Sequence, residues 1–79
     1  MFYYLVKYSF ASVKPVCGPF KTKKDAWESA LADAQNEFNI DKANEFNPDM
    51  MTYEDSGEIV LVNHFTDRDD TTEWIIFEI

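Results

Sequence analysis

The last eight residues of the chain, 72–79, are apolar on both sides of an extended backbone. Side chains of a strand alternate between two faces. Here large apolar residues occupy both sets, with Trp74 and Ile76 on one face and Ile75, Phe77 and Ile79 on the other. A strand that is apolar on both faces is typical of the interior of a sheet. We therefore predict a central strand at 72–79, which limits how the rest of the chain is arranged.

Two further strands are predicted beside it. Residues 2–10 alternate with a period of two and are rich in aromatic and branched side chains, which favours a strand. Residues 58–65 form the next strand, and the polar turn 66–71 joins it to the last strand as an antiparallel hairpin. Placing the last strand between the other two gives every neighbour an antiparallel partner and the strand order 1-3-2.

A helix is predicted to begin after Thr22, which can cap it together with Asp25 three residues later. Apolar residues then recur at helical spacing and form one stripe, comprising Ala26, Trp27, Ala30, Leu31, Ala34 and Phe38. Beyond Asn39 the stripe is interrupted, because Asp41 falls on the apolar face. We therefore predict a break near Asn39 and a short further turn that ends before Pro48.

Together these elements predict an α+β fold of the order β-α-β-β, with a three-stranded antiparallel sheet and one main helix on one face. The chain, residues 1–79, is long enough for one compact domain only. Residues 11–20 hold two prolines and a glycine and predict a loop with at most a short edge strand, while 47–57 is expected to be irregular. One helix covers one sheet face, so the second is covered either by 11–20 and 40–57 or by another molecule.

The distribution of charge excludes several functions. The chain has 79 residues and a net charge of −8, which repels the phosphates of nucleic acid, so we expect no direct nucleic-acid binding. Residues 1–24 carry five lysines and no acid, whereas residues 25–79 carry all 15 acids. No apolar run is long enough to span a membrane. The single cysteine, Cys17, forms no internal disulfide and favours a cytoplasmic location.

No motif predicts catalytic or metal chemistry. His64 is the only histidine and lies in a predicted strand, where it is most simply a half-exposed structural residue. A nucleophile pair of Cys17 and His64 is conceivable, but no local pattern supports it. The acids Asp67, Asp69 and Asp70 lack the spacing of a calcium loop and fit a turn. We therefore expect no enzyme activity, no metal site and no cofactor.

The acids of the middle segment are the most distinctive feature of the sequence. They recur every four residues, at Asp33, Glu37, Asp41 and Glu45, about 6 Å apart along a helix. Like charges at this spacing destabilise a helix slightly, so local stability does not require them. Either they form an ordinary solvated face, or they belong to an acidic surface that imitates a nucleic-acid backbone and binds a basic groove on a partner protein. That surface would also include the turn acids Asp67, Asp69 and Asp70.

In size, acidity and lack of catalytic motifs, the chain resembles the small accessory proteins of phages and mobile elements, such as anti-CRISPR and other anti-defence inhibitors. The resemblance implies a non-enzymatic inhibitor that occupies the basic groove of a nucleic-acid-handling protein. Its partner would be a protein with a basic surface, and neither nucleic acid nor a membrane. A second hypothesis is a small structural or regulatory homodimer that associates through an aromatic sheet face.

Overall fold

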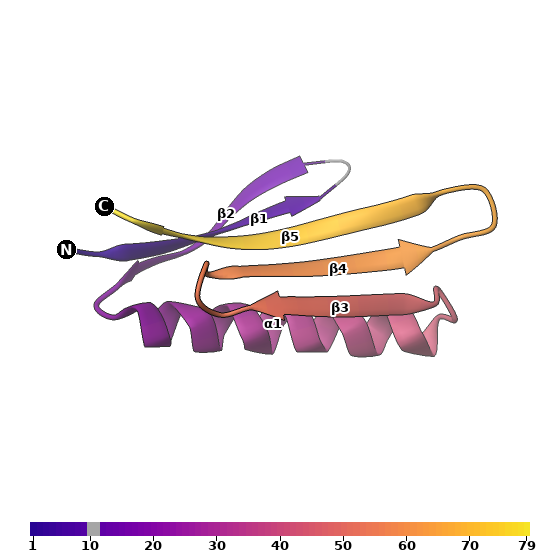
Figure 1. Cartoon of the computed structure of the whole chain (residues 1–79), viewed down its shortest axis with the longest axis horizontal. Helices are drawn as coiled ribbons and strands as arrows, with labels where there is room; N and C mark the ends of the chain where they lie inside the picture. The colour runs from indigo at the N-terminus through magenta and orange to yellow at the C-terminus, as the bar shows by residue number, and fades with distance from the viewer. Residues whose placement is uncertain (10–11) are drawn as a thin grey trace.

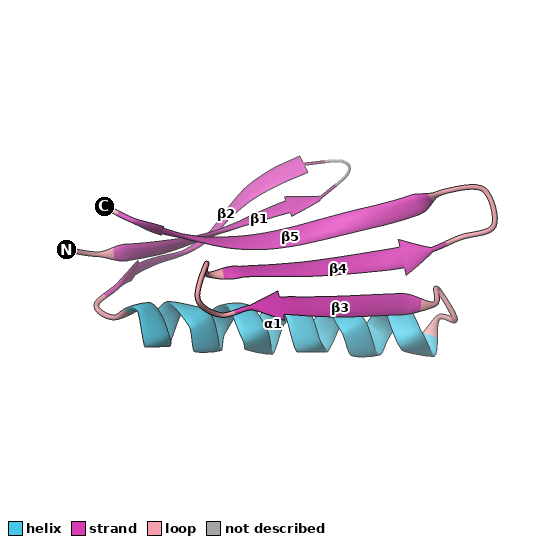
Figure 2. Cartoon of the chain, in the orientation of Figure 1, coloured by secondary structure: helices cyan, strands magenta, loops and turns pink. Residues whose placement is uncertain are grey.

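The computed structural model describes residues 1–9 and 12–79 and has a five-stranded antiparallel sheet with one long helix against one face (Figure 1). The elements in chain order are β1 (Tyr3–Ser9), β2 (Ser12–Phe20), α1 (Lys23–Ala43), β3 (Pro48–Tyr53), β4 (Glu58–His64) and β5 (Asp69–Glu78). The strands assemble in the order β2-β1-β5-β4-β3. Figure 2 shows that α1 runs along the sheet for much of its length, and the molecule is elongated, 43 × 20 × 18 Å.

The predicted three-stranded sheet of order 1-3-2 is wrong. The strands expected at 2–10, 58–65 and 72–79 correspond to β1, β4 and β5, which lie side by side as β1-β5-β4. The segments 11–20 and 47–57, expected to be a loop and irregular, supply the edge strands β2 and β3, so the chain runs β-β-α-β-β-β. Residues 10 and 11, which those predictions included, lie outside the described residues.

The positions of β2 and β3 at the two edges of the sheet explain why these segments form strands although they contain prolines. β2 pairs only with β1, and β3 only with β4, so each leaves one side of its backbone without a partner strand. Proline has no N–H to donate and is tolerated at such an edge, as for Pro48 in β3 and for Pro15 and Pro19 in β2. Between β3 and β4 the chain turns at Gly57, whose φ of 68° suits a residue without a Cβ.

The helix begins as predicted but continues further. The side chain of Thr22 accepts a hydrogen bond from the amide of Asp25 at 3.1 Å, which confirms the N-cap. The predicted break near Asn39 does not occur. Asp41, whose position on the apolar face suggested that break, instead accepts a hydrogen bond from Asn63 Nδ2 at 2.9 Å and so fits against the sheet. No helix in the described part of the chain is long and apolar enough to cross a membrane.

The core lies between α1 and the sheet. Four large side chains of the sheet are almost fully buried there, namely Leu5, Ile59, Leu61 and Trp74. The fully buried residues of the helix are small, namely Ala26, Ala30 and Ala34. Because alanine side chains are short, this line of the helix can lie close to the sheet. The larger residues of the predicted stripe, such as Trp27 and Leu31, are partly buried and pack against this core.

Candidate functional site

The first two acids of the row predicted along the helix, Asp33 and Glu37, point toward the sheet. Asp33 Oδ2 accepts a hydrogen bond from Trp74 Nε1 at 2.8 Å and lies 3.6 Å from Lys7 Nζ. Glu37 forms a hydrogen-bonded ion pair with the same lysine, whose ammonium also lies 5.2 Å from the centre of the Trp74 ring. Burial lowers the pKa of Lys7, but the hydrogen bonds and charges of Glu37 and Asp33 outweigh this and raise it above its usual value.

The last two acids of the predicted row lie near the C-terminal end of α1. Asp41 is held by Asn63, as described above. Glu45 lies just beyond the helix, is exposed and has no side-chain partner among the described residues. Asn63 pairs with Asp70 in the sheet, so this end of α1 lies near the turn between β4 and β5 (Figure 1).

The acids predicted in that turn also have partners, although Asp69 and Asp70 already belong to β5. Arg68 Nη1 lies 3.5 Å from Asp67 Oδ2, and Arg68 Nε donates to Asp70 Oδ1 at 3.2 Å. Asp69 lies against His64 instead. The structure therefore gathers the turn acids with Asp41 and Glu45 at one end of the molecule, while Asp33 and Glu37 lie between helix and sheet.

A helical repeat in the sequence already carries the signal for these internal contacts. Asp33 and Glu37 come seven residues after Ala26 and Ala30, which is close to two helical turns, so they share the buried line of the helix. Lys7 likewise shares the β1 face of the buried Leu5. The helical repeat of α1 and the strand alternation of β1 together place the ammonium of Lys7 opposite the carboxylates of Asp33 and Glu37.

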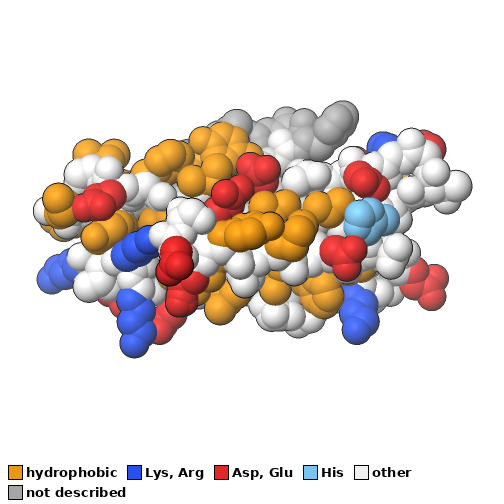
Figure 3. Space-filling model, in the orientation of Figure 1, with side chains coloured by type: hydrophobic (Ala, Val, Ile, Leu, Met, Phe, Trp, Pro, Cys, Tyr) orange, Lys and Arg blue, Asp and Glu red, His pale blue; other side chains and the backbone are white. Residues whose placement is uncertain are grey.

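The second face of the sheet is not covered by the described residues. The described parts of the segments 11–20 and 40–57, which offered one way to cover it, form β2, β3, the end of α1 and the turns next to β3. Figure 3 shows apolar side chains gathered along this side of the molecule, with acidic side chains among them. We call it the open face and define it by the strand residues that alternate with the buried ones. Its apolar members are Tyr4, Val6 and Tyr8 of β1, Met51 and Tyr53 of β3, Val60 and Val62 of β4, and Ile75 and Phe77 of β5.

Two carboxylates lie in the middle of the open face. Glu73 pairs with Val60 and Glu58 with Ile75, so the two acids occupy diagonal positions on adjacent strands. The Cα atoms of residues in such positions lie roughly 7–8 Å apart. Both are half-buried, and neither has an ion-pair partner among the described residues. No lysine or arginine from the strands, as far as their side chains are described, lies on this face. Sequence reasoning missed this pair, although both acids alternate with apolar residues.

At one end of the open face, His64 bridges two further carboxylates. Its Nε2 lies 2.9 Å from Asp49 Oδ2 of β3, and its Nδ1 lies 3.0 Å from Asp69 Oδ1 of β5. An ionised carboxylate only accepts hydrogen bonds, so both contacts are hydrogen bonds only when both ring nitrogens carry a proton. The hydrogen bonds that the protonated ring donates to Asp69 and Asp49 raise the pKa of His64 above its usual value.

The nucleophile pair of Cys17 and His64, which was conceivable from the sequence, is not formed. Cys17 lies on β2 and His64 on β4, with β1 and β5 between them. Three strand spacings amount to roughly 14 Å, which is far beyond hydrogen-bond reach. Within the described residues, no group of three His, Cys, Asp or Glu side chains is arranged to hold a metal ion.

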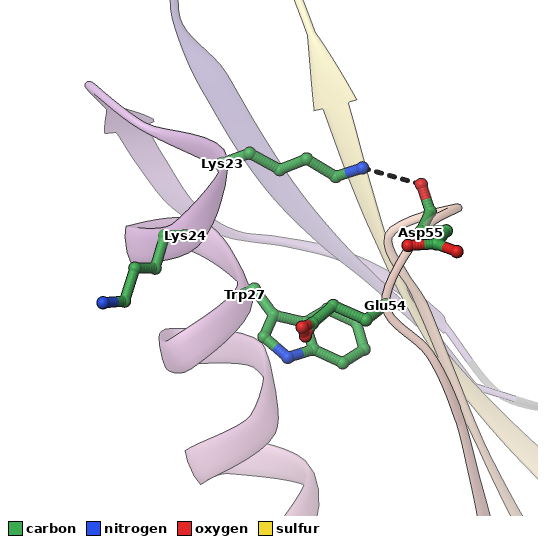
Figure 4. Close-up of a pocket in the computed structure, with 5 residues that line it drawn as sticks. All are labelled: Lys23, Lys24, Trp27, Glu54 and Asp55. Atoms are coloured by element: carbon green, nitrogen blue, oxygen red, sulfur yellow. Dashed lines mark hydrogen bonds between the residues drawn. The ribbon is translucent and has the colours of Figure 1, made fainter.

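Shallow cavities lie beside the two ends of α1. One of about 320 Å³ is lined by Lys23, Lys24, Trp27, Glu54 and Asp55. In Figure 4, Lys23 reaches from the helix to the backbone carbonyl of Asp55, at 2.8 Å, and Lys24 points away from Trp27. Another of about 420 Å³ lies at the opposite end of the helix. The first cavity mixes lysine and acidic side chains and contains no arrangement of a nucleophile with a base.

Comparison with known proteins finds no family model, curated protein or solved structure that matches this chain. We therefore infer the function from the surfaces described above.

Proposed function

We propose that this protein is a non-enzymatic binding module that uses its open face to hold a protein with a basic and partly apolar surface. The observation that supports this is the composition of the open face, in which exposed apolar side chains surround carboxylates that no described cation neutralises. Met51, Tyr53 and Phe77 are 40%, 48% and 38% exposed there. Contiguous apolar surface of this kind is typical of an interaction site.

The carboxylates determine the charge of the partner. Glu58 and Glu73 are half-buried among apolar side chains, where a lysine or arginine from a partner gains charge-assisted hydrogen bonds. The net charge of −8 adds attraction at longer range, which speeds association with a basic protein. Apolar contact then supplies affinity, and the acids supply selectivity.

A homodimer through the same face is the less favoured alternative. Most dimers are two-fold symmetric, so a surface that binds its own copy has to be complementary to itself. Stacking two open faces would place Glu58 and Glu73 of one copy against the same acids of the other. Like charges brought together at an interface weaken binding. The apolar area would favour such a dimer, but the charge of the face favours a cationic partner.

The concrete form of this proposal is an inhibitor of a nucleic-acid-handling protein. A groove that binds a single strand combines lysine and arginine with aromatic side chains, so it offers cations to the carboxylates of the open face and aromatic surface to its apolar side chains. The resemblance to anti-CRISPR and related inhibitors is consistent with this action in the cytoplasm. Of the acids first expected to form the binding surface, Asp69 lies on the open face and Glu45 is exposed, while Asp33, Glu37 and Asp41 serve contacts within the molecule.

A synthetic peptide with the proposed chemistry tests this function. A dodecapeptide of alternating arginine and leucine, acetylated and amidated at its ends, should bind the protein in calorimetry. The affinity should fall by about tenfold or more between about 50 mM and about 500 mM salt, since screening shortens the range of the attraction. A glutamate–leucine peptide of the same length is the control and should not bind. Equal binding of both peptides, or an affinity indifferent to salt, would contradict the proposal.

A further inference from the structure

We propose that His64 sets the negative charge of the open face, so that the face binds a cationic partner more tightly when the ring is neutral than when it is protonated. This inference rests on the proposed function and adds its regulation. It starts from the position of His64 on the same face as Glu58 and Glu73, between two strands that each present a carboxylate to it.

Charged groups reach His64 from both strands packed against β4. Asp49 approaches Nε2 from β3 at 2.9 Å, and Asp69 approaches Nδ1 from β5 at 3.0 Å. The cation of the following turn, Arg68, is engaged by Asp67 and Asp70. On the opposite face of the sheet, α1 presents Asp41, which is bound to Asn63. The ring of His64 is therefore in contact with two carboxylates. Among the described residues, no cation is in contact with it.

Protonation changes what these two carboxylates offer a partner. The imidazolium donates one hydrogen bond to Asp49 and one to Asp69, which occupies an oxygen of each and cancels one unit of negative charge. The neutral ring keeps a single N–H, so one carboxylate faces a nitrogen lone pair instead of a donor. That carboxylate gains by turning to a partner arginine. The hydrogen bonds to Asp69 and Asp49 raise the pKa of His64, so this exchange is centred at a higher pH than for an ordinary histidine.

The test uses the capped arginine–leucine peptide, because arginine does not titrate in the range concerned. Its dissociation constant is measured at about pH 6 and about pH 8 for the wild type and for His64→Gln. The wild type should bind roughly two- to fivefold more tightly at the higher pH, the effect of one charge at a partly solvated site. The ratio should be smaller in His64→Gln.

Glu78→Gln serves as the matched control. Glu78 also lies on β5, but on the other face and at the opposite end of the strand from Asp69, so this variant should keep the wild-type pH dependence. A second readout does not depend on any variant, because linkage requires the bound peptide to lower the pKa of His64 in an NMR titration of the ring.

The outcomes separate this inference from the function on which it rests. Tight binding with the same pH dependence in wild type and His64→Gln, or a His64 pKa that the peptide leaves unchanged, would overturn the role of His64 and leave the proposed function standing. A lack of peptide binding at both pH values would contradict the proposed function, and the inference with it.

Discussion

Trp74 and Asp33 join the sheet to the helix through a single hydrogen bond, 2.8 Å long, from the indole N–H to the carboxylate. Trp74 is fully buried, so the bond satisfies a polar group that water does not reach. The ammonium of Lys7 lies beside both residues. An acid that the sequence places in a regular surface row is thus part of how the helix packs on the sheet.

Asp33→Ala should destabilise the fold by about 1 to 2 kcal/mol, because it leaves the buried indole N–H without an acceptor. Asp33→Asn keeps an acceptor oxygen and should lose less. Urea unfolding followed by tryptophan fluorescence measures both. If Asp33→Ala were as stable as the wild type and instead weakened peptide binding, Asp33 would belong to the binding surface after all.

The pair formed by Lys7 and Glu37 should be more strongly coupled than an exposed pair. Their side chains are 23% and 29% exposed, against 82% and 62% for Lys24 and Glu28, one helical turn apart on α1. A double-mutant cycle with Lys7→Met and Glu37→Gln should give about 1 kcal/mol of coupling. The same cycle on the exposed pair should give about 0.3 kcal/mol. Equal coupling energies would show that partial burial has no effect here.

Enlarging the buried alanines of α1 should separate the helix from the sheet. Ala30→Leu and Ala34→Leu add volume where the side chain is fully buried, and each should destabilise the protein by about 1 to 3 kcal/mol. Ala32→Leu is the matched control, because Ala32 is exposed on the same helix and should tolerate the change. Thermal unfolding of the three variants tests this, and a comparable loss in all three would refute the packing described.

The pH dependence of stability should follow His64. Its pKa is raised in the folded protein, so its stabilising contribution is fully present below the unfolded value of about 6.5 and is lost as pH rises through the folded value. The stability difference between wild type and His64→Gln should therefore shrink as pH rises above about 6.5, in urea unfolding at a series of pH values. A difference that grows with pH would mean that the ring is held neutral.

Much of the sheet could be predicted from local alternation. The strand that carries Trp74 is apolar on both faces, and the helix start at Thr22 has a cap that needs no tertiary context. β2 and β3 could not be found in the same way, because prolines and turn residues obscure their pattern. Only pairing at the sheet edge, where a missing N–H is harmless, makes Pro48 compatible with a strand.

The candidate site was harder to predict from the sequence than the sheet, because spacing along a helix does not tell which side of the helix meets the sheet. The four-residue recurrence of Asp33 and Glu37 is equally compatible with solvent and with the core until Lys7 is placed opposite them. To predict the acids of the open face, the register of β4 against β5 must be known, because that register places Glu58 and Glu73 at diagonal positions on adjacent strands. Residues this distant along the chain become neighbours only through that pairing.

Charge reversal on the open face tests the central claim most directly. The double variant Glu58→Lys with Glu73→Lys is compared with Glu28→Lys with Glu45→Lys, which alters the net charge equally but on the helix and just beyond it. If the open face holds the cationic partner, the first variant should bind the arginine–leucine peptide at least about tenfold more weakly, and the second should differ from the wild type by less than about threefold. An equal or greater loss in the helix variant would contradict the account, because binding would then follow overall charge or the helix surface.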